Sequence, residues 1–326
     1  MSLLKLENIS VGYPPAAPLL SGLDLSLEKG QVACIAGRNG SGKSTLMRTL
    51  AGVQKPLAGT VRLDDKILQE LSPNDLARTL AIVTTEHVPV GHLRVEEMVS
   101  LGRYPYTGPF GKLNREDRRA VGEAMEMTGC HSLAGQFTYT LSDGQWQRVM
   151  IARALAQEPV ILLLDEPTGF LDWPGKAGTF KMLRQLASAG GPAIVFASHD
   201  LEMALPVSDV AWVLDEQKIL SGTPEDTLSN GTLEKAFGLE PGTILHNHYA
   251  AARVSDKLTV TGPAHLQRLV SQALARENSR KPITLRGVIL ADDSEGRMSL
   301  QYQQEGTGRL AFSSVQELLQ YVRKEN

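Results

Sequence analysis

The sequence predicts an α/β fold in which a mostly parallel sheet is covered by helices on both faces. An antiparallel β layer precedes this core, a helical insertion interrupts it, and a small α+β domain follows it. Three observations predict this organisation. Short, continuously apolar segments alternate with helical stretches, which is typical of strands buried on both faces of a parallel sheet. Leu3–Val11 and Leu23–Leu27 instead alternate apolar and polar side chains, as half-buried strands do. A glycine-rich loop joins one apolar strand to a helix.

Size and composition set the limits of the prediction. The chain has 326 residues, enough for about two domains of the usual ~150 residues each. Its net charge of −3 argues against a nucleic-acid-binding surface spread over the whole molecule. Its two cysteines, Cys34 and Cys130, provide no disulfide framework and favour a reducing compartment. The sequence has no apolar run of the ~18–20 residues that span a bilayer and begins with no secretory signal, so we expect a cytosolic protein.

Strands are predicted first in the N-terminal layer and then in the core. The N-terminal layer is expected to contain the strands Leu3–Val11 and Leu23–Leu27 and a pair, Val61–Leu63 and Ile67, around the turn Asp64-Asp65. The core strands are short apolar runs, each followed by a helical or loop segment. They are Val32–Ala36, Ala81–Val83, Val160–Leu164, Ala193–Ala197 and Val210–Leu214.

Helices dominate an insertion at about residues 87–150. Amphipathic helices are predicted at Val95–Val99 and Arg115–Met127, joined by a Gly/Pro-rich loop, Arg103–Gly111. The core unit is expected to span residues 1–240, followed by a linker at 241–250 and an α+β domain at 251–326. The expected elements of that domain are strands at Leu258–Val260, Thr284–Leu290, Ser299–Tyr302 and Leu310–Phe312 and helices at Pro263–Arg276 and Ser313–Arg323.

A phosphate-binding loop is the most informative motif. The residues that follow the apolar strand match G-x-x-x-x-G-K-[ST], and an apolar helical segment follows them. Glycines let backbone N–H groups turn inward around an anion, and the N-terminus of the helix adds its dipole. We expect Lys43 to reach the β- and γ-phosphates of a nucleoside triphosphate and Ser44 to hold Mg²⁺. The predicted nucleotide-binding residues of this loop are Gly37, Arg38, Asn39, Gly40, Ser41, Gly42, Lys43, Ser44 and Thr45.

Two carboxylates end a second apolar strand. Four aliphatic residues precede Asp165 and Glu166, so burial of that strand places both acids at the carboxyl edge of the sheet, beside the phosphates. Asp165 is predicted to position Mg²⁺ through its water shell. Glu166 is predicted to accept a proton from the water that attacks the γ-phosphate.

A second anion site is predicted at the start of another helix. Ser142 is the expected N-cap of a helix that runs from Gln145 to Gln157, and the exposed helix terminus attracts anions. One chain cannot easily bring this site and the phosphate loop to the same γ-phosphate, whereas two chains arranged head to tail can. The residues predicted to act across such a homodimer are Leu141, Ser142, Asp143, Gly144 and Gln145.

With these motifs in this order, residues 1 to about 240 resemble the ATP-binding cassette (ABC) ATPases, a group of P-loop NTPases. Residues 141–145 resemble the signature motif of that family, and Gln147-Arg148 follows as in its members. The resemblance implies ATP hydrolysis with Mg²⁺ and assigns three further residues. Tyr13 resembles the aromatic residue that stacks on adenine, Asp172 resembles the D-loop residue at the dimer interface, and His199 resembles the switch histidine that contacts the γ-phosphate.

The chain departs from the family pattern at one position. The family usually has a glutamine after the strand that begins near Ala81, where it senses the metal and the membrane partner. Here the sequence is Thr84-Thr85-Glu86-His87. Ungapped alignment places Thr85 at that position, whereas we favour Glu86 as the substitute because a carboxylate can order Mg²⁺-bound water. The choice between Thr85 and Glu86 stays open.

Residues 94–108 resemble the corresponding region of importer ATPases for iron-siderophores, haem and cobalamin. In that group the region docks a coupling helix of the permease, and Gly102, Tyr104, Pro105 and Tyr106 are predicted to form the receiving surface. The resemblance implies an integral membrane permease as a partner, a substrate-binding protein as an indirect one, and a peripheral location on the cytoplasmic face of the inner membrane. The cargo is not predicted.

One alternative function and two features of the C-terminal region complete the analysis of the chain. The alternative is a soluble ABC ATPase that acts on ribosomes or nucleic acid, but a single cassette with a short insertion favours transport, and no nucleic acid is expected. The role of the C-terminal domain stays open. His246 and His248 are expected to be solvated rather than to bind metal, and the basic cluster Arg276–Lys281 is expected to form a solvated turn.

Overall fold

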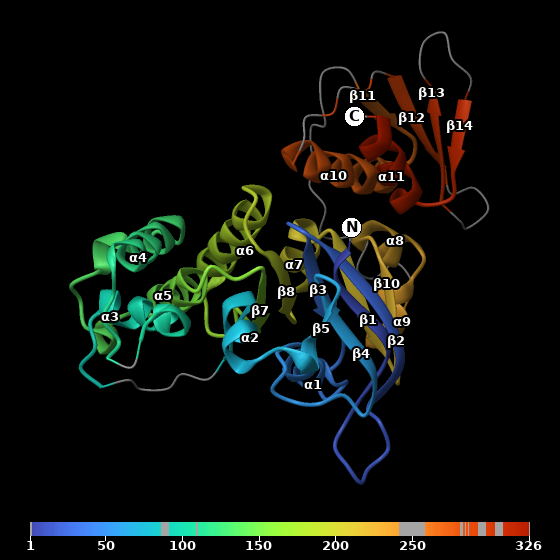
Figure 1. The fold of residues 1–326 in the computed structure, drawn as a ribbon. Coiled ribbons are helices and arrows are strands. Elements are labelled where there is room, and N and C mark those ends of the chain that lie inside the picture. Colours follow the sequence, from blue (N-terminus) through green and yellow to red (C-terminus); the bar gives the residue numbers. More distant parts are fainter. Residues whose placement is uncertain are drawn as a thin grey trace.

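The strands of the computed structural model form three sheets among the residues that it describes (Figure 1). These residues are 2–85, 91–108, 110–240, 258–280, 283, 285, 287–292, 298–303 and 309–325. Glu86, His246, His248 and the predicted linker at 241–250 therefore lie outside the described residues. No helix in the described part of the chain is long and apolar enough to cross a bilayer.

The central sheet has six strands in the order β10-β9-β3-β8-β7-β6. All neighbours pair in parallel except β10, which pairs antiparallel with β9. Every residue of β3 (Val32–Ala36) and of β8 (Ala193–Ala197) is buried, as expected for strands covered on both faces. The remaining strands are β6 (Leu80–Val83), β7 (Ile161–Asp165), β9 (Val210–Asp215) and β10 (Lys218–Gly222).

Alternate residues of these strands pack into two different cores, because successive side chains of a strand point to opposite faces. Val32 and Cys34 of β3 pack toward the helices of the insertion, whereas Ala33 and Ile35 pack toward the N-terminal sheet. The first face is covered by α5 (Asp143–Ala156) and α6 (Trp173–Ser188) and the second by α1 (Lys43–Leu50). The helices around this sheet are α1 (Lys43–Leu50), η1 (Leu68–Glu70), α2 (Pro73–Thr79), α6 (Trp173–Ser188) and α7 (Leu201–Val207).

The N-terminal layer is a four-stranded antiparallel sheet in the order β2-β1-β4-β5. Its turn residues Asp64 and Asp65 have φ values of 49° and 61°, which suits the two-residue turn that joins a tight hairpin. Helix α1 lies between this layer and the central sheet, so the layer supports the start of the phosphate-loop helix. The strands are β1 (Ser2–Val11), β2 (Leu20–Glu28), β4 (Ala58–Leu63) and β5 (Lys66–Ile67).

The other helices of the insertion pack along α5, and η2 (Leu101–Tyr106) meets its C-terminal part. Gly102 is required at its close approach to α5, because a Cβ there would lie 2.1 Å from the carbonyl oxygen of Arg153. The predicted Gly/Pro-rich loop at 103–111 is partly wrong, since its first residues belong to a 3₁₀ helix. The elements are α3 (Val95–Ser100), η2 (Leu101–Tyr106), α4 (Arg115–Met127), η3 (His131–Leu133), η4 (Thr138–Thr140) and α5 (Asp143–Ala156).

The C-terminal region forms a four-stranded sheet, order β11-β12-β13-β14, with two helices on one face (Figure 1). One apolar core joins these helices to Ala211 and Val213 of β9 and to Leu228 of α8. The elements of this region and of the segment before it are α8 (Pro224–Ser229), α9 (Thr232–Phe237), β11 (Leu258–Thr261), α10 (Ala264–Arg280), β12 (Gly287–Asp292), β13 (Ser299–Gln303), β14 (Arg309–Phe312) and α11 (Val315–Glu325).

The predicted fold class is confirmed, with one local correction in the C-terminal region. Thr284, where a strand is expected to start, lies outside the described residues, and the described strand β12 begins at Gly287. The basic cluster at 276–281 is not a solvated turn: Arg276 lies inside α10 and is 7% exposed. A sequence pattern cannot distinguish a solvated cluster from one that pairs with acids elsewhere in the chain, and here the acids come from the first 240 residues.

Candidate functional site: a nucleotide-binding edge of the central sheet

The phosphate loop connects β3 to α1 through two residues in the left-handed region. Gly40 has φ 78° and Gly42 has φ 103°, a conformation that glycine adopts without the Cβ clash of other residues. Gly42 is the N-cap of α1, so the loop ends on a helix terminus with free N–H groups. Arg38, Asn39 and Gly40 are exposed. The loop is thereby open to a ligand in solution.

Lys43 is held inside this loop. Its Nζ donates to the carbonyl oxygen of Gly37 at 2.9 Å and to that of Arg38 at 3.2 Å. Burial lowers the pKa of Lys43, and the nearby Glu166 and Asp165 oppose that effect. Lys43 is 7% exposed, so the loop holds a desolvated cation close to two carboxylates. Such a cation interacts more strongly with a phosphate than a solvated one.

The other loop residues divide into exposed and buried groups. Ser44 is exposed at the first turn of α1, whereas Thr45 is 7% exposed. The Ser41 Oγ is buried and has no hydrogen-bond partner in the described part of the chain. Buried hydroxyl groups are usually hydrogen-bonded, so Ser41 retains an unused donor within the loop.

Asp165 and Glu166 lie where the sequence places them, at the carboxyl end of β7. Glu166 has φ 49°, and its N–H donates to the carbonyl oxygen of Ala197 at the end of β8. Its Oε1 lies 2.9 Å from Nε2 of His199. Burial raises the pKa of Glu166 to about 6, with Lys43 opposing the rise. Burial also lowers the pKa of His199, so the structure brings together a base candidate and a histidine that is neutral near pH 7.

A hydrogen-bond network that the sequence did not predict supports His199. The next residue, Asp200, accepts from Thr168 Oγ1 and from Lys176 Nζ, both at 2.8 Å. Its own N–H donates to Ser198 Oγ at 3.0 Å. Thr168 and Lys176 belong to the segment between Glu166 and the first turns of α6. This network ties the loop after β8 to the loop after β7, and the only sequence signal for it is the closeness of these residues to Glu166 and His199.

Tyr13 lies beside the phosphate-loop helix. Its hydroxyl is 3.4 Å from Thr45 Oγ1, and this contact is the main cause of its lowered pKa. The side chain is 48% exposed. A half-exposed ring at the edge of an anion-binding loop is placed to stack on a base.

The signature segment forms a second exposed helix terminus. Ser142 is the N-cap of α5 and closes a capping box with Gln145: Ser142 Oγ accepts from the Gln145 N–H, and Gln145 Oε1 accepts from the Ser142 N–H. Asp143 is also exposed. In Figure 1, α5 lies with α3 and α4, well away from α1. The structure therefore does not bring Leu141–Gln145 to the phosphate loop of the same chain.

The D-loop segment lies next to this helix terminus. Asp172 is the N-cap of α6 and accepts from the Gly175 N–H at 2.9 Å. A Cβ on Gly144 would lie 3.8 Å from Cδ2 of Leu171, which places the two segments side by side. Phe170 and Trp173, on either side of Asp172, are 72% and 71% exposed. Two large exposed aromatic side chains flank a polar N-cap, a composition that suits a protein interface.

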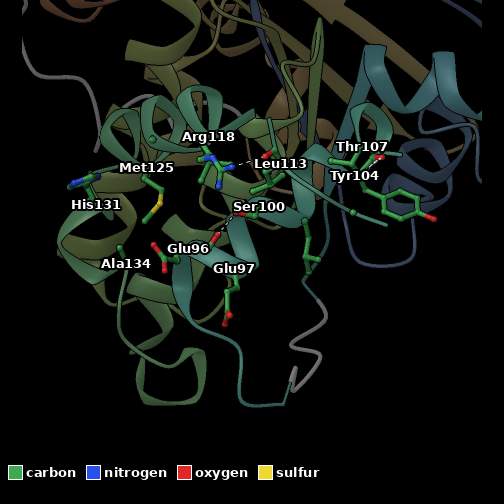
Figure 2. Close-up of a pocket in the computed structure, with 14 residues that line it drawn as sticks. Glu96, Glu97, Ser100, Tyr104, Thr107, Leu113, Arg118, Met125, His131 and Ala134 are labelled. Atoms are coloured by element: carbon green, nitrogen blue, oxygen red, sulfur yellow. Dashed lines mark hydrogen bonds between the residues drawn. The ribbon is translucent and has the colours of Figure 1, made fainter. Parts of the chain in front are cut away.

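A cavity of about 590 Å³ lies in the helical insertion (Figure 2). In Figure 2, Glu96, Glu97 and Ser100 of α3 lie on one side of it, and Arg118 and Met125 of α4 on another. The predicted receiving surface near this cavity is partly wrong. Tyr104 is 80% exposed, but Gly102 is buried and the hydroxyl of Tyr106 donates to the carbonyl oxygen of Gln157.

The predicted metal ligands Ser44 and Asp165 carry oxygen atoms. Ser44 lies in the first turn of α1, and Asp165 is the last residue of β7. Within the described ranges, no group of three or more His, Cys, Asp or Glu side chains forms a metal cluster. Ser44 and Asp165 supply a hydroxyl and a carboxylate, the ligand types that Mg²⁺ uses together with waters and substrate phosphates. They fit a metal that arrives with a nucleotide. Thr85 is exposed just after β6, and Glu86 lies outside the described residues.

Known proteins similar to this chain are ATP-binding proteins of transporters. Residues 20–169 match the family described as ABC transporter. The chain is 39% identical over 239 residues, 73% of its length and 82% of the relative, to the uncharacterized ABC transporter ATP-binding protein MJ0873 of Methanocaldococcus jannaschii. It is 36% identical over 242 residues, 74% of its length and 89% of the relative, to the iron(3+)-hydroxamate import ATP-binding protein FhuC of Bacillus subtilis. The ferric enterobactin transport ATP-binding protein FepC of Escherichia coli is 35% identical over 237 residues, 72% of this chain and 87% of the relative.

Solved structures agree with these sequences. The ADP conformation of MJ1267, an ATP-binding cassette of an ABC transporter, matches 74% of this chain and 100% of its own, with a TM-score of 0.66 and 26% identity. The dimeric structure of MJ0796, a bacterial ABC transporter cassette, matches 68% of this chain and 98% of its own, with a TM-score of 0.59 and 27% identity.

Proposed function

The chain belongs to the ABC transporter family, and from this premise we propose that it is the ATP-hydrolysing subunit of an importer for iron-siderophores, haem or cobalamin. The observation that carries the proposal is the joint placement of Lys43, Glu166 and His199 at one edge of the central sheet. Relatives named for iron(3+)-hydroxamate import and ferric enterobactin transport support the iron-siderophore part of this proposal.

The phosphate loop would bind the triphosphate. Its N–H groups and the α1 terminus surround the anion, and Lys43 exchanges the carbonyl oxygens of Gly37 and Arg38 for phosphate oxygens. Tyr13 would stack on the adenine. Ser44 and Asp165 would hold Mg²⁺, which when bound neutralises charge on the β- and γ-phosphates.

Glu166 would act as the general base. It takes a proton from the attacking water while the bond between the γ-phosphorus and the bridging oxygen breaks. A pKa of about 6 leaves the carboxylate ionised at pH 7 yet more basic than an ordinary glutamate. His199, neutral at that pH and 2.9 Å from Glu166, would orient the water and contact the γ-phosphate.

Two chains would close head to tail around two ATP molecules. Within one chain the exposed terminus of α5 lies away from α1 (Figure 1), so its Ser142 and Gly144 are free to meet the γ-phosphate bound by a second copy. Asp172, between the exposed Phe170 and Trp173, would lie in the same interface. The dimeric structure of the MJ0796 cassette supports such an assembly.

The cavity between α3 and α4 would receive the permease. Its walls combine apolar side chains with Glu96, Glu97 and Arg118, and Tyr104 stands exposed at its rim. An apolar cavity with charged edges suits a short amphipathic helix. Docking there would place the protein on the cytoplasmic face of the membrane, with a substrate-binding protein as an indirect partner.

The experiment is capture of the full chain from membranes of its own source organism after mild detergent extraction. We expect recovery of a polytopic membrane protein and a higher ATPase rate in its presence. Tyr104→Ala should weaken that capture and leave the ATPase rate of the isolated chain unchanged, whereas Tyr139→Ala, a second exposed tyrosine, is the matched control. Recovery of ribosomal RNA or DNA in place of a membrane protein would support the alternative and overturn the proposal.

A further inference from the structure

The C-terminal region is attached to the cassette through buried ion pairs as well as apolar contacts. Arg276 of α10 donates from Nη1 and Nη2 to the two carboxylate oxygens of Glu225 in α8, at 2.8 and 2.7 Å. The side chains are 5% and 0% exposed. A two-pronged pair of this kind fixes orientation as well as distance, so it holds α10 in one position on α8.

A second anchor joins α11 to the same helix. Asp226 of α8 accepts from the backbone N–H groups of Val315 and Gln316 at 2.8 and 3.0 Å. These groups lie in the first turn of α11, where N–H groups lack partners inside the helix and a carboxylate is favourable. Two consecutive acids, Glu225 and Asp226, thus bind the two helices of the C-terminal region.

A third contact extends to the central sheet through Asp209. This carboxylate is 2% exposed and lies just before β9. Its Oδ2 accepts from the Val32 N–H at 2.8 Å, from Arg184 Nη1 at 2.8 Å and from Arg280 Nη2 at 2.7 Å. Val32 is the first residue of β3, Arg184 lies on α6 and Arg280 ends α10. One buried carboxylate therefore joins the C-terminal region to two cassette elements.

Arg280 also holds the turn that precedes β3. Its Nη2 donates to the carbonyl oxygen of Gly30 at 2.7 Å as well as to Asp209. Gly30 and Val32 flank Gln31 at the entrance of the strand, and β3 enters the phosphate loop at Gly37. The guanidinium of a residue 250 positions away thus holds the base of the strand that carries the nucleotide-binding loop.

Through Arg184, the Asp209 carboxylate also contacts α6, the helix that follows Asp172. Asp172 is the predicted D-loop residue and the N-cap of α6, and Arg184 lies about three turns later. Removal of one partner from a buried ion pair leaves an uncompensated charge, which the surrounding structure must move to solvate. A change at Arg280 therefore has a direct physical path to β3 and to α6.

From these contacts we propose that residues 258–325 regulate the nucleotide site by holding the base of β3 through Arg280 and Asp209. The inference rests on the proposed nucleotide-binding function. A movement of α10 on the cassette would withdraw the guanidinium from Gly30 and Asp209, loosen the entrance of β3 and lower the affinity of the phosphate loop. By linkage, nucleotide binding would strengthen the docking of the C-terminal region by the same factor.

The test is the affinity of the full chain for ADP with Mg²⁺, measured by titration calorimetry, together with hydrogen exchange at the Val32 amide. Arg280→Gln should raise the dissociation constant about fivefold or more and speed exchange at Val32, because the carboxylate loses a donor. Arg280→Lys keeps the charge and should recover most of the affinity. Arg268→Gln, an exposed arginine on the same helix, is the matched control and should resemble the wild type.

The apolar core between α8 and α10 is untouched in Arg280→Gln, so we expect the variant to stay folded, which circular dichroism checks. Should it unfold, Arg276→Lys supplies the second measurement, since it removes the two-pronged pair with Glu225 and keeps the charge. An affinity within error of the Arg268→Gln value in the folded Arg280→Gln variant, or in Arg276→Lys where Arg280→Gln unfolds, would overturn the inference and leave the proposed function intact. A wild-type chain that binds no nucleotide would overturn both.

Discussion

His199 at the end of β8 and Glu166 at the end of β7 contact each other, with Nε2 2.9 Å from Oε1. Both side chains are partly withdrawn from water, and Lys43 lowers the pKa of each. The pKa of Glu166 is raised and that of His199 is lowered. At pH 7 the carboxylate is therefore ionised and the histidine is neutral. This is the combination that a general base and a neutral hydrogen-bonding partner require.

The first prediction concerns the pH dependence of ATP hydrolysis. Since burial raises the pKa of Glu166 to about 6, the carboxylate is protonated below that pH and cannot accept a proton. The ATPase rate of the full chain should therefore fall as the pH drops through about 6. The measurement is the rate between about pH 5 and pH 8 at saturating ATP, with folding checked at each pH. An acid limb near the ordinary glutamate value of 4.5 would contradict the assigned environment of Glu166.

A second prediction concerns stability at neutral pH. Because the folded-state pKa of Glu166 exceeds its unfolded value, the protonated form favours folding. That contribution is complete below pH 4.5 and is lost as the pH rises through about 6. Glu166→Gln should therefore stabilise the nucleotide-free protein at pH 7 by about 1–2 kcal/mol while abolishing turnover.

Urea unfolding at pH 7 and at pH 4 measures this difference. The stabilisation should shrink at pH 4, where the wild-type carboxyl is protonated. Glu126→Gln, an exposed glutamate on α4, is the control and should change stability little at either pH. A destabilised Glu166→Gln at pH 7 would show that the ionised carboxylate is favourable in the fold.

The third prediction tests base stacking. Tyr13→Ala should weaken ATP binding about 5- to 150-fold, because stacking of a base on an aromatic ring contributes about 1–3 kcal/mol. Tyr13→Phe keeps the ring and loses the contact with Thr45, so it should bind ATP nearly as well as the wild type. Calorimetric titration of ATP provides the measurement, with Tyr139→Ala as the control. Equal losses in Tyr13→Ala and Tyr13→Phe would mean that the hydroxyl, rather than the ring, is the binding group.

A fourth prediction concerns the junction of the helical insertion with α5. Gly102→Ala should cost about 2–4 kcal/mol of unfolding free energy, because the new Cβ would meet the carbonyl oxygen of Arg153 at 2.1 Å. Gly122→Ala, inside α4 and with open space around its Cβ, should instead stabilise the protein by up to about 1 kcal/mol. Thermal unfolding of the two variants gives the comparison. Equal stabilities would show that the two helices separate easily.

Local sequence patterns predict the site best where the chemistry is contained in a few neighbouring residues. The strand Val32–Ala36 and the N-cap at Ser142 appear as expected, because apolar runs and caps act over short distances. Asp165 and Glu166 also lie at the predicted strand end. The roles of these residues stay predictions until the experiments are done.

Contacts between distant segments were not predictable in the same way. Nothing near Arg276 indicates that its partner is Glu225, 51 positions away, so the sequence pattern alone predicts a solvated turn. Gly102 was expected on a receiving surface, yet its lack of a side chain serves the approach to Arg153. Such pairings depend on the packing of whole elements, which composition and periodicity do not encode.

The most direct test of the central claim asks whether the phosphate loop of one chain meets the Ser142 helix of another. Asn39 and Ser142 are both exposed, whereas the native Cys34 and Cys130 are buried. Cysteines introduced at positions 39 and 142 should therefore be the ones that oxidise. Asn39→Cys and Ser142→Cys are combined in one chain with Glu166→Gln, which is expected to retain ATP, and the protein is oxidised with and without ATP and Mg²⁺. We predict a covalent dimer that forms only with ATP. A disulfide within a single chain would contradict the claim. So would a protein that stays monomeric after oxidation both with and without ATP.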